Sequence, residues 1–242
     1  MTDKQGRPCV SVIIPVHNGG ASFRMAARAA LAGLGEGDEL IVVDDGGTDG
    51  SAAFARSLGA RVIATPRPAS GPAAARNLAA RHAKGDILLF LDADVLAPRS
   101  TVEKVRQFFA ENPGHAAVMG NYDTRPPARN LLSQYKNLLQ HFVHARASEE
   151  TFTFWGAVGG IRREAFEAVG GFDEARYHVP CIEDIDLGSR LAAAGLRIRL
   201  KKDLQVRHLK RWSALSLLKS DVLRRALPWT ELILERTGMK DD

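Results

Sequence analysis

Residues 85–94 read Gly-Asp-Ile-Leu-Leu-Phe-Leu-Asp-Ala-Asp, an apolar run that ends in two carboxylates. Five consecutive apolar residues bounded by Gly85 and by aspartates are typical of a short strand that is buried on both faces. Strands of that kind belong to parallel sheets covered by helices on both sides. Residues 85–94 therefore predict an α/β fold with a pair of carboxylates at the end of one strand.

The residues before this strand repeat an alternation of strand and helix. Apolar runs predict strands at 10–16, 40–43 and 61–64, and Ala-rich stretches predict helices at about 22–32, 51–58 and 72–84. A helix between two successive strands implies a crossover connection, and hence a mostly parallel, Rossmann-like sheet with helices on both faces. In such sheets ligands bind beyond the carboxyl ends of the strands, where the aspartates lie.

The second half of the chain is less regular. Its pattern predicts helices at about 99–111, 128–146 and 183–194, strands near 116–120 and 204–208, and a Gly-rich segment at 155–160. The tail, residues 212–236, reads as an amphipathic helix interrupted at Pro228, because proline lacks the N–H that a helix interior needs. Since no repeat or linker divides the chain, we expect a single domain over residues 1–242.

Composition narrows the class of protein. The chain has 242 residues, 45% of them hydrophobic, which suffices for a core and excludes disordered and collagen-like classes. Cys9 and Cys181 lie far apart and form no CxxC pair, so we expect two reduced thiols. The polar residues 1–8 lack the apolar core of a secretory signal, and no apolar run reaches the ~20 residues of a membrane span. We therefore expect a cytoplasmic protein.

Two acidic clusters follow strands. Asp92 and Asp94 supply the hard oxygen ligands that suit Mg²⁺ or Mn²⁺, although two aspartates can also simply form a turn. Asp44 and Asp45 precede Gly46-Gly47, so turn formation explains one of them and leaves the other free to accept a hydrogen bond from a ligand. A calcium loop at Asp45 is excluded, because its twelfth position is Arg56 rather than glutamate.

A third acidic cluster opens a predicted helix. Glu183, Asp184 and Asp186 compensate the dipole of that helix at about 0.3–1 kcal/mol each, which by itself accounts for them. Successive helical residues point about 100° apart, so at most one of the adjacent pair faces a given site. His141 and His144 have the spacing of two metal ligands, but no third ligand with zinc spacing follows them.

Six motifs together resemble family 2 glycosyltransferases, enzymes with a GT-A fold. The motifs occur in the family's order and cover about residues 9–210: Val10–Asn18, Ile41–Ser51, Gly71–Asn77, Gly85–Asp94, Gly159–Phe166 with Gly170–Asp173, and Glu183-Asp184. One departure is Gly47, where the family phrase usually has serine. The resemblance divides the expected domain into a nucleotide-sugar-binding half at about 9–95, an acceptor-binding and catalytic half at about 96–210, and a basic helical tail at about 211–242.

The resemblance also implies roles for individual residues. Asp184, with Glu183 beside it, resembles the general base of an inverting transfer; Trp155 and Gly156 precede the segment that commonly shapes the acceptor site. Asp94 is implied as the metal ligand, with Asp92 nearer the ribose or sugar, and His208 as a residue that reaches the metal or the diphosphate. The implied nucleotide-sugar site consists of residues of the first motifs: Pro15, Val16, Asn18, Asp44, Asp45, Gly71, Arg76, Asp92 and Ala93.

The resemblance implies substrates only as classes. The donor is a nucleotide-diphosphate sugar, UDP sugars first and GDP sugars next, used with Mn²⁺ or Mg²⁺. The acceptor is a hydroxyl compound, lipid-linked acceptors included, in bacterial glycan, glycolipid or polysaccharide synthesis at the cell envelope.

Two other functions remain open. Phe90–Val95 also resembles the motif of haloacid-dehalogenase-like phosphohydrolases, with Asp92 as nucleophile, but that motif normally lies on the first strand. A non-catalytic module that binds sugar nucleotides is the second alternative.

The net charge of +5 is localised. Residues 197–225 hold ten Lys and Arg against two Asp and Glu, a net of +8. Nucleic acid is not expected as a partner, because Trp212 is the sole aromatic residue in this block and aspartates line the predicted groove. The block can stabilise a leaving diphosphate, form a solvated face, or hold an amphipathic helix against anionic lipid at the inner face of the membrane. The apolar side of that helix consists of Leu215, Leu218, Val222 and Leu223.

Overall fold

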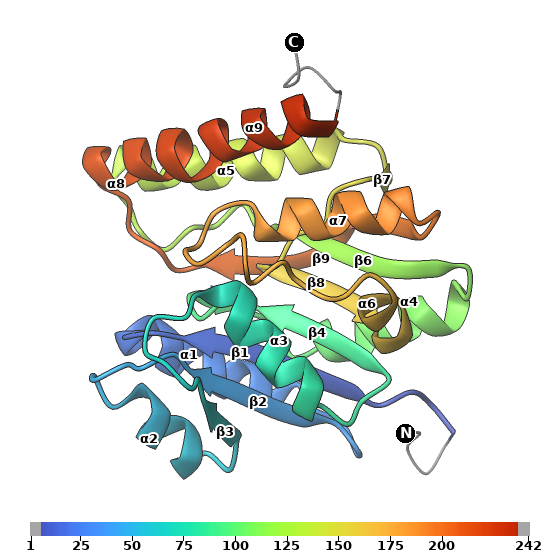
Figure 1. The fold of residues 1–242 in the computed structure, drawn as a ribbon. Coiled ribbons are helices and arrows are strands. Elements are labelled where there is room, and N and C mark those ends of the chain that lie inside the picture. Colours follow the sequence, from blue (N-terminus) through green and yellow to red (C-terminus); the bar gives the residue numbers. More distant parts are fainter. Residues whose placement is uncertain (1–5, 237–242) are drawn as a thin grey trace.

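The computed structural model describes residues 6–236 and is built on one mixed sheet (Figure 1). The predictions that concern residues 1–5 and 237–242, including part of the polar N-terminus and the end of the tail, lie outside the described residues. The strands run in the order β3 (Arg61–Ala64), β2 (Glu39–Asp44), β1 (Val10–Val16), β4 (Ile87–Leu91), β8 (Val158–Arg162), β6 (His115–Tyr122), β9 (Arg197–His208) and β5 (Val95–Leu96), with β7 (Glu150–Thr151) also paired to β9.

The first four strands are parallel, and the second half of the sheet is mixed. β1 pairs in parallel with β2 and β4, and β2 pairs in parallel with β3. β8 is antiparallel to both β4 and β6, whereas β6 and β9 are parallel. As a result β1, β2 and β4 all end at the same edge of the sheet, and their acidic residues are brought together there.

Helices cover both faces of the sheet, as the alternation of elements predicts. Val12 and Ile14 of β1 face a core shared with α1 (Gly20–Ala32), α2 (Ser51–Ser57) and α4 (Thr101–Glu111). Ile13 points the other way, into a core shared with α3 (Pro72–His82), α6 (Arg163–Ala168) and α7 (Glu183–Ala193). This alternation follows from the two-residue period of a strand. Cys9 and Cys181 are both free thiols, as expected.

The end of the Gly-rich segment at 155–160 belongs to strand β8, which the sequence pattern did not predict. Gly159 and Gly160 lie inside this strand, between β4 and β6. A Cβ on Gly160 would lie 2.8 Å from Cγ1 of Val105, and one on Gly159 would lie 2.4 Å from Cζ of Phe154. Glycine is therefore present because the helix and the aromatic ring pack directly on the strand backbone.

The tail corrects a prediction, because it is helical without a break at Pro228. It consists of α8 (Ala214–Leu218), a π-helical segment η1 (Lys219–Ala226) and α9 (Leu227–Arg236), which we call the tail helix. The N–H of Leu227 donates to the carbonyl of Val222, five residues back. This wider turn removes the close contact between the Pro228 ring and the preceding turn that would break an α-helix.

The tail helix and α5 (Leu131–Arg146) lie together across one end of the molecule (Figure 1). Lys136 of α5 forms an ion pair of 2.5 Å with Asp221 of the tail helix. Among residues 6–236, no helix is long and apolar enough to cross a membrane.

Candidate active site

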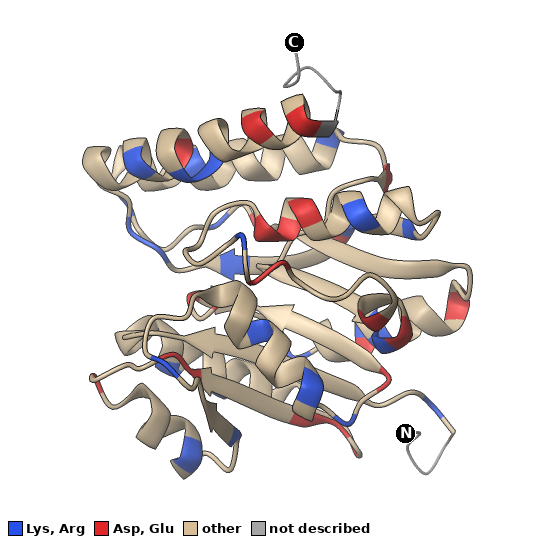
Figure 2. Cartoon of the chain, viewed as in Figure 1, with Lys and Arg blue, Asp and Glu red and all other residues tan. Residues whose placement is uncertain are grey.

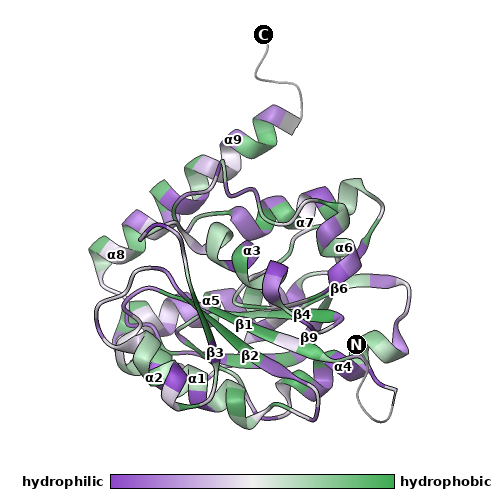
Figure 3. Cartoon of the chain, turned by 60° about the horizontal axis from the view of Figure 1, so that its bottom comes forward, coloured by the Kyte–Doolittle hydropathy of each residue, from purple (hydrophilic) through white to green (hydrophobic). Residues whose placement is uncertain are grey.

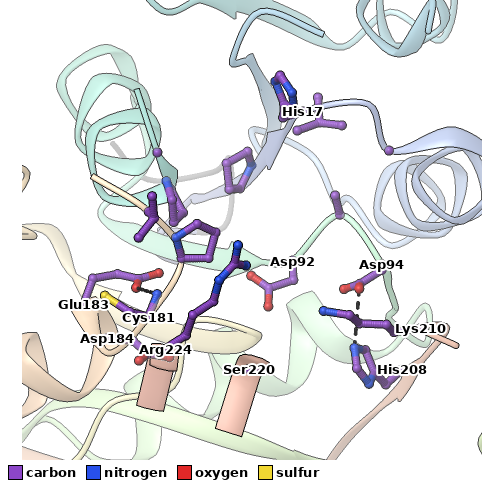
Figure 4. A pocket seen from close by; sticks show the side chains of 18 of the residues that line it. His17, Asp92, Asp94, Cys181, Glu183, Asp184, His208, Lys210, Ser220 and Arg224 are labelled. Carbon is purple, nitrogen blue, oxygen red and sulfur yellow. Dashed lines mark hydrogen bonds and ion pairs between the residues drawn. The ribbon is translucent and has the colours of Figure 1, made fainter. Parts of the chain in front are cut away.

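A cavity of about 870 Å³ lies beyond the carboxyl ends of β1, β2 and β4 (Figure 4). The start of α7 and the inner face of the tail helix complete its wall. The cavity brings together most of the residues that the sequence predicts for the site: Pro15, Val16, Asn18, Asp45, Gly71, Arg76, Asp92, Ala93, Asp94, Trp155, Glu183, Asp184 and His208. Asp44 and Gly156 do not line it, and each instead holds a lining residue or loop in place.

The two adjacent aspartates after β2 have different surroundings. The Asp44 carboxylate accepts the N–H of Gly47 at 2.9 Å and so shapes the turn. The Asp45 carboxylate accepts the N–H groups of Ser70 at 2.8 Å and Gly71 at 3.0 Å, and the hydroxyl of Thr65 at 2.9 Å. Asp45 therefore holds the loop at residues 65–71 against the strand ends, and its predicted contact with a nucleotide base stays a prediction.

Asn18 connects two loops at the same edge. Its side-chain oxygen accepts the N–H of Thr48 at 2.7 Å, and its φ of 52° places it in the left-handed region that Asn tolerates better than most residues. The loop after β1, which carries Pro15, Val16 and Asn18, is thereby fixed to the loop after β2.

Arg76 is a buried guanidinium that joins the sheet to α7. One of its nitrogens lies 2.7 Å from Asp92 Oδ1 and the other 2.9 Å from Glu183 Oε1. The guanidinium also lies over the ring of Phe172, 5.4 Å from the centroid. A Cβ on Gly156 would lie 3.0 Å from Nη2 of Arg76, so this position has room only for glycine beside the arginine as it stands.

Asp184 is a buried carboxyl group at the start of α7 that lines the cavity. Burial, reinforced by the charge of Glu183, raises the pKa of Asp184 to about 6. Its two oxygens accept the N–H groups of Gly156 at 3.0 Å and Ile185 at 2.9 Å, which fix its orientation. A carboxylate with a raised pKa that faces a cavity is a candidate general base.

Glu183 is engaged in a different way from its neighbour. Arg76 occupies one of its oxygens, and the N–H of Cys181 donates to the other at 2.9 Å. The two adjacent carboxylates at the start of α7 thus differ in their partners: Glu183 is ion-paired to Arg76, whereas both hydrogen bonds of Asp184 come from backbone N–H groups.

Asp94 and His208 form the other end of the site. Asp94 Oδ2 lies 3.4 Å from His208 Nε2. Burial acts to raise the pKa of Asp94, but the hydrogen bond and charge of His208 outweigh it and the pKa is lowered. The imidazole is stacked on Tyr122, with ring centroids 4.5 Å apart and 5° between the planes.

These two side chains fit a divalent cation. At metal–ligand distances of about 2.0–2.2 Å, one ion can contact two atoms that are this close. Among the residues that the structure describes, no group of three or more His, Cys, Asp or Glu side chains is arranged to hold a metal. The remaining positions would then belong to phosphate oxygens and water, as is usual for Mg²⁺.

The cavity also contains residues that the sequence did not reveal as part of the site. Tyr122 comes from β6, Lys136 and Gln140 from α5, and Ser220, Arg224 and Arg225 from the tail helix. For Arg224 and Arg225 the basic block at 197–225 was a signal, but no pattern indicates that the tail turns back over the strand ends.

Comparison with protein families identifies the chain. The model of "Glycosyl transferase family 2" matches residues 11–170, and that of "N-terminal domain of galactosyltransferase" matches residues 138–212. This chain belongs to glycosyl transferase family 2. Membership confirms the predicted family and argues against the phosphohydrolase alternative for Asp92.

Individual relatives agree with this assignment. The catalytic subunit of cellulose synthase 1 from Komagataeibacter xylinus, described as UDP-forming, is 28% identical over 177 residues, which are 68% of this chain and 24% of the relative. The pre-mycofactocin glycosyltransferase of Mycobacterium tuberculosis is 29% identical over 208 residues, 82% of this chain and 42% of the relative. This family 2 chain therefore spans less than half the length of either protein.

Solved structures confirm the GT-A fold. The mannosyltransferase PcManGT from Pyrobaculum calidifontis, in complex with GDP-Man and Mn²⁺, matches with a TM-score of 0.67 and 25% identity over 88% of this chain and 60% of its own. S. aureus TarS in complex with UDP-GlcNAc matches with a TM-score of 0.65 and 18% identity over 88% of this chain and 67% of its own.

Proposed function

We propose that this family 2 chain transfers a sugar from a nucleotide-diphosphate sugar to an acceptor hydroxyl, with inversion at the anomeric carbon. The observation that carries the proposal is Asp184, a buried carboxyl whose pKa is raised to about 6 in the cavity that also contains Asp92, Asp94 and His208. A UDP sugar is the first choice of donor and a GDP sugar the next, which agrees with the ligands of the two solved relatives.

In the proposed reaction the acceptor oxygen attacks the anomeric carbon from the side opposite the diphosphate. The new C–O bond forms as the bond to the diphosphate oxygen breaks, and the electron pair of that bond leaves with the nucleoside diphosphate. Asp184 accepts the hydroxyl proton during attack, since an un-ionised hydroxyl is a poor nucleophile at neutral pH. Arg76 binds both Asp92, at the end of β4, and Glu183, at the start of α7. It thereby fixes the position of the donor-binding residues relative to Asp184.

Asp94 and His208 are the residues that would hold a divalent cation, Mn²⁺ or Mg²⁺. When bound, such an ion supplies positive charge that stabilises the leaving diphosphate. The Mn²⁺ in the complex of the mannosyltransferase relative supports the use of a divalent cation. Lys210, which lines the cavity and lies over the Trp212 ring, adds a further positive charge at this end.

Nucleotide binding should depend on a divalent metal and on Asp94. In a thermal-shift panel of UDP, GDP, CDP and dTDP sugars, we expect at least one to raise the melting temperature with Mn²⁺ and not with EDTA. Asp94→Asn should lose this Mn²⁺-dependent shift, because it removes the negative charge that faces the ion. Asp203→Asn, an exposed substitution of the same kind outside the cavity, is the matched control. No metal-dependent shift with any nucleotide would contradict the proposal.

A non-catalytic binding module differs from an enzyme in one measurement. Family 2 enzymes of the proposed kind release free nucleotide from the donor, by transfer or by slow hydrolysis. A chain that shows the metal-dependent thermal shift, yet releases no nucleotide with any donor and acceptor tried, would be a binding module.

We also propose that the protein acts on the inner face of the membrane, bound peripherally through α5 and the tail helix. Most of the large hydrophobic side chains that the described part of the chain exposes lie on these two elements. Hydrophobic and hydrophilic positions alternate along α8 and α9 (Figure 3). Leu131, Tyr135 and Phe142 of α5 are 80%, 56% and 52% exposed, and Leu215 and Leu218 of the tail helix are 76% and 62% exposed. The exposed cations Arg146 and Lys219 lie on the same elements and complement anionic headgroups.

Binding to vesicles should need both anionic lipid and these apolar side chains. We expect co-sedimentation with phosphatidylglycerol vesicles and not with phosphatidylcholine vesicles, at about 1 kcal/mol per basic residue near the surface. Leu215→Gln/Leu218→Gln should weaken it, because both side chains are exposed and would enter the interface. Met25→Gln, an exposed apolar residue on α1, serves as the control. Sedimentation that does not depend on lipid charge would contradict membrane binding through the basic residues. The basic block would then be interpreted as a solvent-exposed charged face.

A further inference from the structure

The inner face of the tail helix carries two arginines into the active-site cavity. Ser220, Arg224 and Arg225 line the cavity, and Figure 4 shows the side chain of Arg224 pointing into it. Ser220 lies four residues before Arg224 and five before Arg225. In a π-helix, whose hydrogen bonds span five residues, side chains four and five apart fall on one face. The π-helical segment η1 is thus the feature that directs both arginines inward.

Arg224 and Arg225 are half-buried cations, and no carboxylate of residues 6–236 lies within ion-pair distance of either guanidinium. Within residues 6–236, neither Arg224 nor Arg225 forms a hydrogen bond or an ion pair, although both are partly withdrawn from water. Lys136, the other cation on this wall, is already paired with Asp221 at 2.5 Å. A partly desolvated guanidinium is a strong hydrogen-bond donor, and the planar arrangement of its N–H groups matches the oxygens of a phosphate.

Elsewhere the basic block at 197–225 is largely neutralised. Arg199 pairs with Glu150 at 3.0 Å, Arg207 with Asp123 at 2.9 Å and Lys201 with Asp203 at 2.9 Å. α8 contains no charged residue, whereas Lys219, Arg224 and Arg225 lie in η1 together with Asp221, and acidic positions follow in α9 (Figure 2). The positive charge of the block that remains available is therefore concentrated around the cavity and the first half of the tail helix.

The charge of Arg225 acts on the acceptor side of the cavity. It opposes the effect of burial on the pKa of Asp184, and it adds to the effect of burial in lowering the pKa of His144 on α5 to about 4. Arg76 acts on both Asp184 and Asp92, whereas His208 and Lys210 act on Asp94. Of the two arginines of the tail helix, Arg225 thus lies close enough to the proposed base to act on it, while His208 and Lys210 act at the proposed diphosphate end.

We propose that Arg224 and Arg225 bind a phosphate group of the acceptor, and that the acceptor is a phosphate-bearing amphiphile whose apolar part lies along the exposed apolar surface of α5 and the tail helix. The same helix places the two arginines toward the cavity and Val222, Leu223 and Leu227, which are 40%, 58% and 58% exposed, toward the outside. One helix can therefore contact both the charged and the apolar part of such a molecule. The inference rests on the proposed function.

The test measures binding of hexyl phosphate by isothermal titration calorimetry, without nucleotide. We expect the wild type to bind hexyl phosphate more tightly than hexanol or inorganic phosphate. Arg224→Gln/Arg225→Gln should lower the affinity for hexyl phosphate by at least about tenfold, which corresponds to about 1.4 kcal/mol of binding free energy. Arg56→Gln/Lys202→Gln also removes two cations, but these residues lie on α2 and β9 and do not line the cavity, so binding should be unchanged. The melting temperature of each variant verifies that it folds.

Three results would overturn the inference. The first is equal affinity of the wild type and the arginine variant for hexyl phosphate. The second is inorganic phosphate binding as tightly as hexyl phosphate, which would indicate a site for a free anion. The third is a loss of Mn²⁺-dependent UDP or GDP affinity in the arginine variant, which would assign Arg224 and Arg225 to the donor diphosphate. If the wild type binds no nucleotide at all, the proposed function is wrong. The hexyl phosphate titration, which contains no nucleotide, still tests phosphate binding by Arg224 and Arg225.

Discussion

Asp184→Asn should lower the rate of sugar transfer by about 10²–10⁴-fold while nucleotide affinity stays within about twofold of the wild type. Asparagine keeps the size of the side chain and can still accept the N–H of Gly156, which lies 3.0 Å from Asp184 in the native protein. It cannot take a proton from the acceptor hydroxyl. The measurement is the single-turnover rate with saturating donor, together with calorimetry of nucleotide binding.

Asp186→Asn is the matched control for this variant. Asp186 lies on the same first turn of α7, is ion-paired to Arg190 at 2.8 Å and does not line the cavity, so its replacement should change stability and leave the chemical step intact. In the wild type the rate should fall as the pH drops through about 6, where Asp184 becomes protonated. Asp186→Asn should keep that acid limb and Asp184→Asn should lose it. Full transfer activity in Asp184→Asn would contradict the assignment of the base.

The position of the site could be predicted from the sequence because strand ends are local features. Apolar runs define β1, β2 and β4, and a parallel arrangement places their carboxyl ends at one edge, so Asp45, Asp92 and Asp94 had to lie near one another. The meeting of α7 with this edge follows from no local pattern. The position of α7 at the strand ends could be predicted only from the resemblance of Glu183-Asp184 to a family motif.

Other parts could not be predicted, because tertiary packing overrides local propensity. Gly159 and Gly160 weaken a strand in isolation, yet they are required where Phe154 and Val105 pack against the backbone of β8. Likewise, Pro228 ends an α-helix by its own preference, but the π-helical turn before it allows the tail helix to continue. The direction of Arg224 and Arg225 depends on the same turn, and an α-helical reading of the tail would have placed Arg225 away from Ser220.

Arg76→Met should reduce the free energy of unfolding by about 3–5 kcal/mol, the usual effect of removing one partner of a buried ion pair. The Arg76 side chain is 5% exposed and that of Glu183 is 7% exposed, so Glu183 would be left as an uncompensated charge with little water to solvate it. The side chain of Asp92 is 36% exposed, and solvent there reduces its share of the effect. Chemical denaturation of the wild type and the variant measures the difference.

Three further variants separate the buried charge from the loss of packing. Arg67→Met, at an exposed position, should stay within about 0.5 kcal/mol of the wild type. Arg76→Lys keeps a positive charge but cannot bridge two carboxylates with one planar group, so we expect an intermediate loss. Arg76→Met/Glu183→Gln replaces the unpaired Glu183 carboxylate by a neutral amide that can still accept the N–H of Cys181, and it should recover part of the stability.

A double variant as unstable as Arg76→Met would mean that Arg76 acts through its contact with Phe172 rather than through charge. Recovery would instead show that the buried Glu183 carboxylate is tolerated at the start of α7 only because Arg76 neutralises it.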